Sequence, residues 1–235
     1  MRHFMLNQQI DKSMGVLGIY GAGGLGRTLN DYIGISELKY DEIVFIDDTR
    51  DEGIFRKKRI MPFESFYKKF SPLESYIVIG VGEPYLRKIF IDRIHGKGYR
   101  MPVLFLKGSY VSDYATYGEG MVVLPGGRVE DGCRIGDNVI VMDNSIVGHD
   151  SCIGNNVSIS SNVSVCGKCS IGDNVYIGVG SVLRDQINIG SNAVVGMGSV
   201  VMRDVQDGIE VAGNPARGIK KADGKVFSQY YHGII

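Results

Sequence analysis

Residues 129–158 read VEDGCR-IGDNVI-VMDNSI-VGHDSC-IGNNVS, in blocks that each begin with an aliphatic residue. The same six-residue step runs without a change of phase from Val111 to Val201, and Tyr117 is its only position that is not aliphatic. A period of six matches neither the turn of an α-helix nor the alternation of a hairpin. The pattern predicts a solenoid of short strands and tight corners, in which each coil buries its inward residues against the next coil.

The composition suits such a fold and argues against several classes of protein. The chain has 235 residues, 33 glycines, no tryptophan and a formal net charge of zero. The mixed charge gives no electrostatic case for nucleic acid or an anionic membrane. The chain has no run of about 20 apolar residues, so no transmembrane helix is predicted. Residues 1–13 lack a signal pattern and read as a short extension, so we expect a cytoplasmic protein.

Ahead of the solenoid, strand patterns alternate with helix patterns. Apolar runs at 16–20, 43–46, 76–79 and 102–106 predict four strands, and helices are expected after the first strand, at 63–70 and at 87–95. This alternation is typical of a small parallel α/β sheet. We therefore expect an α/β domain at 14–108, a solenoid at 109–219, and a tail at 220–235 that is disordered or partly helical.

A glycine-rich turn joins the first predicted strand to the first helix. Gly21, Gly23 and Gly26 satisfy the pattern G-x-G-x-x-G, in which glycines let the backbone approach a pyrophosphate and the helix N-terminus favours the anion. Asp47 and Asp48 end the next strand, where they could bind a ribose or a base edge. Four strands are too few for two mononucleotide-binding halves, so the pattern favours a nucleotide-sugar over NAD. A turn that only joins strand to helix remains the alternative.

Of the four histidines, only His149 lies in the repeat, between Gly148 and Asp150. A neutral imidazole is the natural general base near pH 7, and an adjacent carboxylate orients it and raises its basicity. Gly167 stands one coil farther along the chain, and we expect open space beside the ring there. A surface histidine without a role remains the alternative.

Metal sites and cysteine chemistry find little support. A γ-class carbonic anhydrase has the same kind of solenoid but needs three histidines, and Cys166-x-x-Cys169 has no partners for a four-ligand zinc site, so we expect no metal. Cys133 and Cys169 belong to a column of small inward residues and are expected in the core. Nothing beyond its closeness in sequence to His149 suggests Cys152 as a nucleophile.

Taken together, the repeat resembles the hexapeptide-repeat acyltransferases, whose fold is a left-handed parallel β-helix. Residues 15–219 are similar to bacterial sugar O-acyltransferases of the sialic-acid O-acetyltransferase type and to N-acetyltransferases acting on nucleotide-linked 4-amino-sugars. The matching motifs are residues 19–24, 45–48, 79–80 with Arg87, 145–150 and 213–216. The resemblance implies a small Rossmann-like domain before the β-helix, and a homotrimer with active sites between neighbouring β-helices.

The resemblance also implies an activity and a set of site residues. The activity is transfer of an acetyl group from acetyl-CoA to the amino group of a nucleotide-linked 4-amino-4,6-dideoxy sugar, by direct attack, as in polysaccharide biosynthesis. His149 matches the general base and Asp150 its acidic partner. The residues matching the substrate site are Gly23, Gly24, Leu25, Asp47, Asp48 and Gly80, and those matching the acetyl-CoA site are Ser158, Gly167, Val179, Gly196 and Met197.

Three positions depart from the family pattern. Leu25 and Ser158 stand where the family usually carries histidines, and Met142 stands where an asparagine commonly lies seven residues before the base. These departures favour an acceptor or a turnover that differs from the characterised enzymes. The alternatives are an O-acetyltransferase acting on a free sugar such as sialic acid, and a non-catalytic relative that binds nucleotide-sugars.

Overall fold

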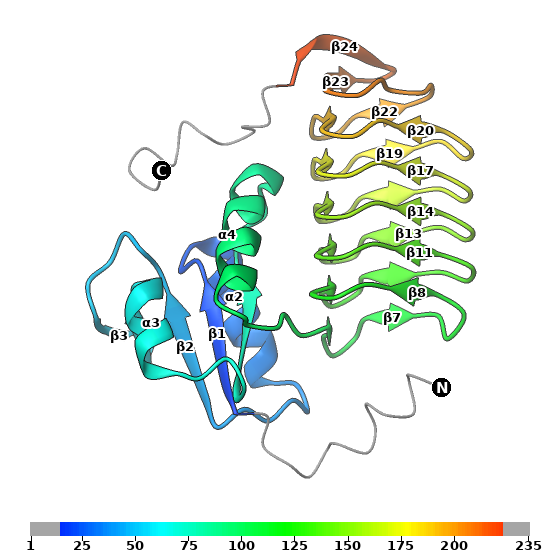
Figure 1. Cartoon of the computed structure of the whole chain (residues 1–235). Coiled ribbons are helices and arrows are strands. Elements are labelled where there is room, and N and C mark those ends of the chain that lie inside the picture. The colour runs from blue at the N-terminus through cyan, green and yellow to red at the C-terminus, as the bar shows by residue number, and fades with distance from the viewer. Residues whose placement is uncertain (1–14, 223–235) are drawn as a thin grey trace. The chain divides into compact units, whose positions relative to one another are not determined.

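The computed structural model describes residues 15–222 (Figure 1). They form two compact units: residues 15–81 with 86–102, and residues 103–222 with Gly82–Tyr85. The extension predicted at 1–13 and nearly all of the tail predicted at 220–235 lie outside the described residues. The longest helix in the described part has 13 residues, fewer than the roughly 20 that a membrane span requires.

The first unit is an α/β fold around a five-stranded sheet. Its strand order is β3-β4-β2-β1-β5, and only the β3–β4 pair is antiparallel. The strands are β1 (Val16–Tyr20), β2 (Glu42–Ile46), β3 (Gly53–Phe55), β4 (Lys58–Met61) and β5 (Ser75–Ile79). The helices are α2 (Gly24–Gly34), α3 (Phe63–Lys69) and α4 (Pro84–Gly96). Three predicted strands and all three predicted helices are therefore confirmed.

Two features of this unit differ from the sequence prediction. The β3–β4 hairpin was not predicted, because its two-residue turn is Arg56-Lys57, with φ of 47° and 63°, in place of the usual Gly or Asn. The prediction of a fourth α/β strand at 102–106 is wrong. That segment contains β6 (Leu104–Phe105), which pairs in parallel with β9 (Val122–Val123) of the β-helix. Phe105 lies one six-residue step before Val111, so the ladder begins one step earlier.

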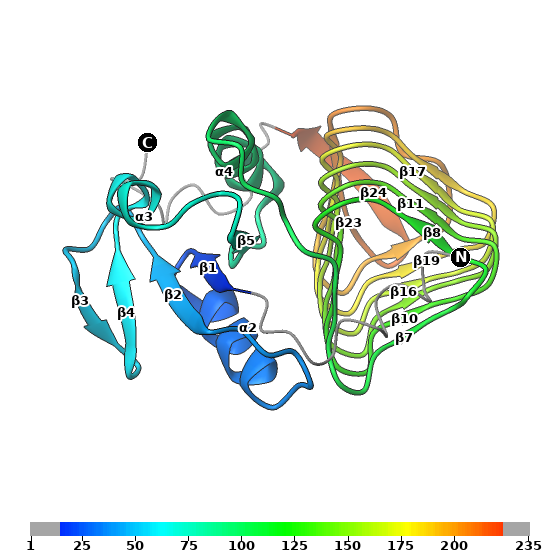
Figure 2. The same cartoon turned by 60° about the horizontal axis from the view of Figure 1, so that its bottom comes forward.

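The second unit is a parallel β-helix whose coils trace three sides (Figure 2). One sheet contains β6, β9, β12 (Ile140–Val141), β15 (Ser158–Ile159), β18 (Tyr176–Ile177), β21 (Val194–Val195), β23 (Ile209–Gly213) and β24 (Ala216–Lys221). The second contains β7 (Tyr110–Val111), β10 (Arg128–Val129), β13 (Ile146–Val147), β16 (Ser164–Val165), β19 (Val182–Leu183) and β22 (Val200–Val201). The third contains β8 (Thr116–Tyr117), β11 (Arg134–Ile135), β14 (Cys152–Ile153), β17 (Ser170–Ile171) and β20 (Asn188–Ile189).

The aliphatic ladder fills the interior of the β-helix. Strands one coil apart pair in parallel, so that every third step of the ladder meets in register. Val123 pairs with Val141 and Val141 with Ile159 in this way, and all three side chains are fully buried. Each such burial contributes about 1.5–3 kcal/mol relative to exposure. The stacked coils therefore form one continuous apolar core, as the period of six predicts.

The corners explain how a coil closes in so few residues. One residue of most corners has a left-handed backbone, and these positions recur at the six-residue step from Gly120 to Gly198. Asparagine and glycine fill most of them, because both tolerate positive φ. The residues with positive φ in this series include Asn138, Asn144, Asp150, Asn156, Asn162, Lys168, Asn174 and Asn192.

One edge of the β-helix also carries a ladder of side-chain hydrogen bonds. Asp137, Asn155, Asp173, Ser191 and Asp207 follow one another at this edge, and each accepts the backbone N–H of the corresponding residue in the preceding coil, at 2.6–3.1 Å. A glycine precedes each of the first four, and a β-carbon there would collide with the next coil. This ladder ties the coils together along one edge.

The regular pattern ends after Val205 because the last coil is shorter. Val205 bridges to Ile189 and Val211 pairs with Val195. Paired positions are therefore separated by fewer residues in this coil than in the coils before it. β24 then turns back antiparallel to β23 through the Asn214-Pro215 turn. The turn expected at 212–216 is thus confirmed, but the hairpin that it closes was not predicted.

Candidate active site

His149 and Asp150 occupy the corner between β13 and β14. The His149 Nδ1 lies 2.9 Å from the Asp150 Oδ2, and both side chains are exposed, at 61% and 57%. The hydrogen bond from His149 holds the pKa of the Asp150 carboxyl below its ordinary value, and the charges of Lys168 and Arg134 act in the same direction. A carboxylate at Nδ1 favours the tautomer with the proton on Nδ1, which leaves Nε2 as the proton acceptor.

Asp150 owes its place to the backbone of the corner. Its φ is 59°, so it fills the left-handed position that asparagine fills in most neighbouring corners. This conformation holds the carboxylate beside the imidazole of the preceding residue. The corner therefore presents an imidazole and a carboxylate side by side on one coil.

The imidazole of His149 lies against Gly167, one coil farther along. A β-carbon on residue 167 would stand 2.5 Å from Nε2 and 2.7 Å from Cε1 of His149. The expectation of open space beside the ring is therefore wrong, because the ring itself fills the space above Gly167. The Gly167 N–H donates to no acceptor among the described residues, whereas its carbonyl accepts from the Gln186 N–H at 3.1 Å. This N–H, on the residue whose Cα packs against the imidazole, is therefore available to a ligand.

The glycine-rich turn of the first unit divides into tightly packed glycines and open ones. A β-carbon on Gly26 would stand 1.8 Å from the Gly21 oxygen, and one on Gly80 would stand 2.6 Å from the Gly26 Cα. Gly80 therefore packs against the turn. In contrast, a β-carbon on Gly23 or Gly24 would meet no atom within 4 Å.

α2 begins at this turn and leaves its first N–H groups available. Gly23 is its N-cap residue, makes no side-chain hydrogen bond to the helix, and no acidic side chain lies in the first turn. Such a helix start favours an anion through its dipole and its free donors. Leu25, which occupies the first turn, is partly buried.

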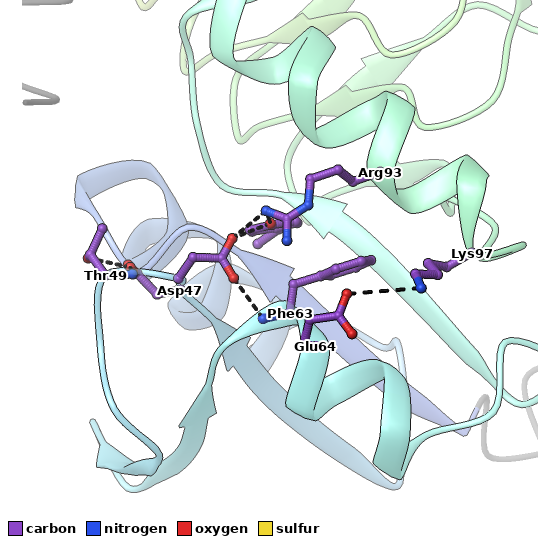
Figure 3. Close-up of polar contacts among 8 residues, drawn as sticks. Asp47, Thr49, Phe63, Glu64, Arg93 and Lys97 are labelled. Atoms are coloured by element: carbon purple, nitrogen blue, oxygen red, sulfur yellow. Dashed lines mark hydrogen bonds and ion pairs between the residues drawn. The ribbon is translucent and has the colours of Figure 1, made fainter. Parts of the chain in front are cut away.

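The two aspartates after β2 are held by different partners. Asp47 Oδ2 accepts the Ala22 N–H of the glycine-rich turn at 3.1 Å, and Oδ1 accepts the Thr49 N–H and hydroxyl at 3.1 and 2.6 Å. Asp47 therefore connects the end of β2 to the turn. Figure 3 shows it beside Thr49.

Asp48 is engaged in a partly buried network. Its Oδ2 accepts the Tyr20 hydroxyl at 2.5 Å and the Arg93 guanidinium at 2.6 Å, and its Oδ1 accepts the Phe63 N–H at 2.9 Å (Figure 3). Burial alone would raise the pKa of the Asp48 carboxyl, but these hydrogen bonds and the charge of Arg93 outweigh it and lower that pKa. Burial and the nearby Asp48 raise the pKa of the Tyr20 phenol. The carboxylate of Asp48 thus binds groups of its own domain.

The residues matching the acetyl-CoA site do not form one cluster. Val179 and Met197 lie at corresponding corners of adjacent coils, with side chains 47% and 75% exposed. The backbone N–H of Gly198 bonds to the Val179 carbonyl, and Gly196 packs against Ala212. Ser158 lies on β15, in the same sheet as the strands β18 and β21 that precede these corners, and is fully buried, without a partner for its hydroxyl among the described residues. Gly167 lies at a different corner, between β16 and β17. Sequence reasoning also did not identify Arg134 and Lys168 beside Asp150, because the six-residue pattern marks only the inward side chains.

The cysteines separate into core and surface. Cys133 and Cys169 are buried, which confirms their predicted place in the core, and Cys152 and Cys166 are partly exposed. The Arg134 guanidinium donates to the Cys152 sulfur at 2.9 Å. Within residues 15–222, no three histidine, cysteine or acidic side chains gather where a metal ion could be held.

Comparisons with known proteins agree with both units. The model of the PglD N-terminal domain matches residues 16–94, and that of the bacterial transferase hexapeptide repeats matches residues 132–167 and 168–203. No curated protein sequence matches the chain. The acetyltransferase domain of PglB from Neisseria gonorrhoeae is 33% identical, with a TM-score of 0.80 over 87% of this chain and 99% of the domain. The same domain has been solved in complex with acetyl coenzyme A.

Two further solved structures resemble the chain. WeeI from Acinetobacter baumannii is 26% identical, with a TM-score of 0.82 over 87% of this chain and 100% of WeeI. PerB from Caulobacter crescentus, solved with CoA and GDP-perosamine, is 22% identical, with a TM-score of 0.77 over 88% of this chain and 97% of PerB. At that identity, PerB shows the shared fold alone.

Proposed function

This chain belongs to the hexapeptide-repeat sugar acetyltransferases with a PglD-type N-terminal domain, and we propose that it acetylates the amino group of a nucleotide-linked amino-sugar with acetyl-CoA. The family makes the chain an acyltransferase. The observation that carries the proposal is the exposed His149–Asp150 pair, whose imidazole packs against Gly167, a residue with an unpaired N–H among the described residues. The acetyl-CoA complex of the related PglB domain supports the choice of donor.

In the proposed mechanism, His149 acts as a general base. The acceptor nitrogen attacks the thioester carbonyl carbon, and Nε2 of His149 takes the proton that the nitrogen loses. The C–S bond then breaks, and the proton passes from the imidazole to the departing thiolate. Asp150 keeps the Nδ1–H in place and stabilises the imidazolium while it carries the proton. No covalent enzyme intermediate is required.

Backbone donors are the candidates for stabilising the charge that develops on the carbonyl oxygen. The Gly167 N–H has no acceptor among the described residues, and the Cα of this residue packs against the imidazole, so this N–H is a candidate donor to the oxyanion. Val179 and Met197 offer exposed apolar surface for the pantetheine arm of acetyl-CoA. Gly196, next to Met197, packs against Ala212 of the following coil. Ser158 is buried, so we assign it no direct contact with acetyl-CoA.

The first unit is proposed to bind the nucleotide. Gly23 and Gly24 leave the start of α2 open to a diphosphate, and Asp47 fixes the turn that they belong to. Leu25 is partly buried beside them, Gly80 packs against the turn, and Asp48 supports the end of β2. We propose a homotrimer as the working assembly, which sedimentation equilibrium would test.

The decisive experiment is a thiol-release assay with acetyl-CoA and UDP-, GDP- and dTDP-linked 4-amino-sugars. We expect one nucleotide-sugar to give turnover that H149A loses. A nucleotide-sugar that is a substrate should also raise the melting temperature, and D47A should reduce that shift. Turnover with free sialic acid, without any effect of nucleotide-sugars, would overturn the proposal in favour of an O-acetyltransferase. Acetyl-CoA binding without turnover on any acceptor would indicate a non-catalytic relative.

A further inference from the structure

We infer that Gly167 is a positioning residue for His149, because its missing side chain creates the space that holds the imidazole in its working orientation. The inference rests on the proposed role of His149 as the base. The relevant atom is the Cα of Gly167, which carries no side chain; the backbone N–H of Gly167 is a separate donor.

Gly167 lies in close contact with the imidazole of His149. A β-carbon at residue 167 would lie 2.5 Å from Nε2, 2.7 Å from Cε1 and 2.9 Å from Cδ2 of His149. These separations are far below the ordinary contact distance of about 3.5–4.0 Å between carbon atoms. Any side chain at residue 167 therefore excludes the observed position of the ring.

The backbone of this corner does not require a glycine at residue 167. The left-handed position of the corner is the next residue, Lys168, with φ of 59°. The residues at the corresponding place one coil to either side of Gly167 are His149 and Asp185, and Asp131 lies one coil before His149. All three carry side chains. Among these coils, the glycine therefore stands at the one place where a side chain would meet the imidazole.

The imidazole is supported on two sides and is otherwise open to solvent. On one side, Asp150 forms a hydrogen bond with Nδ1. On the other side, the Nε2 edge of the ring packs against Gly167 of the next coil. The side chain is 61% exposed, so a methyl group on residue 167 would turn the ring toward solvent without unfolding the coil. Turning the ring displaces Nε2, and a displacement of about 1 Å costs on the order of 10²-fold in rate.

The experiment compares G167A with D185A. Both variants place alanine at the same position of a corner, but only residue 167 faces the imidazole. We expect G167A to lower kcat by about 10²-fold at an unchanged melting temperature, and D185A to keep the wild-type kcat. A near-normal kcat for G167A, or an equal loss in D185A, would overturn the inference.

A second measurement does not depend on activity. Long-range ¹H–¹⁵N spectra of the free protein report the tautomer of each imidazole, and H149A identifies the signal of His149 among the four histidines. We expect the Nδ1–H tautomer in the wild type and in D185A, and averaging of the two tautomers in G167A. An unchanged His149 signal in G167A would contradict the inference.

The two measurements separate this inference from the proposed function. If the wild type releases no thiol with any acceptor while G167A still changes the His149 signal, the proposed function fails and the placement of the ring by Gly167 stands. If the wild type is active and G167A is equally active, the inference fails and the proposed function stands.

Discussion

Asp47–Asp48 follows β2 directly and His149–Asp150 follows β13 after one glycine, yet the side chains of the two pairs differ in their partners and in their exposure. Asp48 binds a phenol, a guanidinium and a backbone N–H of its own domain, and Asp47 holds the glycine-rich turn. His149 and Asp150 bond to each other and are more than half exposed.

The difference separates carboxylates whose hydrogen bonds are formed inside the protein from an exposed pair that is open to solvent. A carboxylate whose hydrogen bonds are already formed inside the protein contributes stability and geometry, and a ligand would have to displace its partners. An exposed pair with a single internal hydrogen bond keeps a nitrogen available for a proton. We therefore expect changes at Asp48 to affect mainly stability, and changes at the His149 corner to affect mainly rate.

The largest effect is expected from H149A. Loss of the base should lower kcat by at least about 10²-fold, whereas the exposed side chain contributes little to the fold, so the melting temperature should stay unchanged. Thiol release and thermal denaturation measure the two quantities. D131A, at the same corner position one coil earlier, serves as the control and should leave both unchanged. Wild-type turnover by H149A would remove the contrast between the two pairs.

The second effect is expected from D48N. The amide cannot replace the charged hydrogen bonds to Tyr20 and Arg93, so local stability should fall by about 2 kcal/mol at pH 7. Hydrogen exchange of the β1 and β2 amides measures this loss. The pKa of the Asp48 carboxyl is lowered in the folded protein, so its contribution is present above the unfolded value of about 4 and is lost as the pH falls below it.

Measuring the stability difference between wild type and D48N at several pH values therefore provides a control. The difference between wild type and D48N should be full at pH 7 and should shrink toward pH 3. A difference that stays constant over this range would mean that the charge of Asp48 contributes nothing.

The third effect is expected from D150N. Asparagine fits the left-handed backbone at this corner, as it does at residues 144 and 156, so the fold should be kept. Without the carboxylate, the imidazolium loses its charged partner, and kcat in the thiol-release assay should fall about 10-fold. D150A, in contrast, should also lower the melting temperature, because alanine is strained at positive φ. Equal rates for D150N and wild type would show that the pairing with His149 has no catalytic value.

The smallest effect is expected from D173A, in the hydrogen-bond ladder along a different edge of the β-helix from that of His149. Asp173 accepts the Asn155 N–H at 2.6 Å, and its loss should cost about 1 kcal/mol of stability with no change in kcat. Urea denaturation measures the cost, and D173N, which keeps an acceptor, should recover part of it. A fall in kcat for D173A would show that this edge also serves the reaction.

The sequence by itself determined the β-helix and the candidate base. Stacking repeats the same contact in every coil, so the inward ladder from Val111 to Val201 specifies the coils without knowledge of any distant contact. Because the repeat is so regular, the one histidine within it, beside an aspartate, can be recognised from the sequence. The glycine-rich turn could also be predicted from the sequence. So could three strands of the α/β unit, because buried parallel strands are continuous apolar runs.

Only the tertiary structure decided the rest, because it depends on contacts between residues far apart in sequence. Asp48 meets Tyr20 and Arg93, which lie in different elements of the α/β unit, and no local pattern joins them. The apolar segment at 102–106 would fit either the α/β sheet or the β-helix, and its pairing with β9 places it in the β-helix. The register placed residue 167 above His149, but the conformation of the imidazole decided that the ring fills that space.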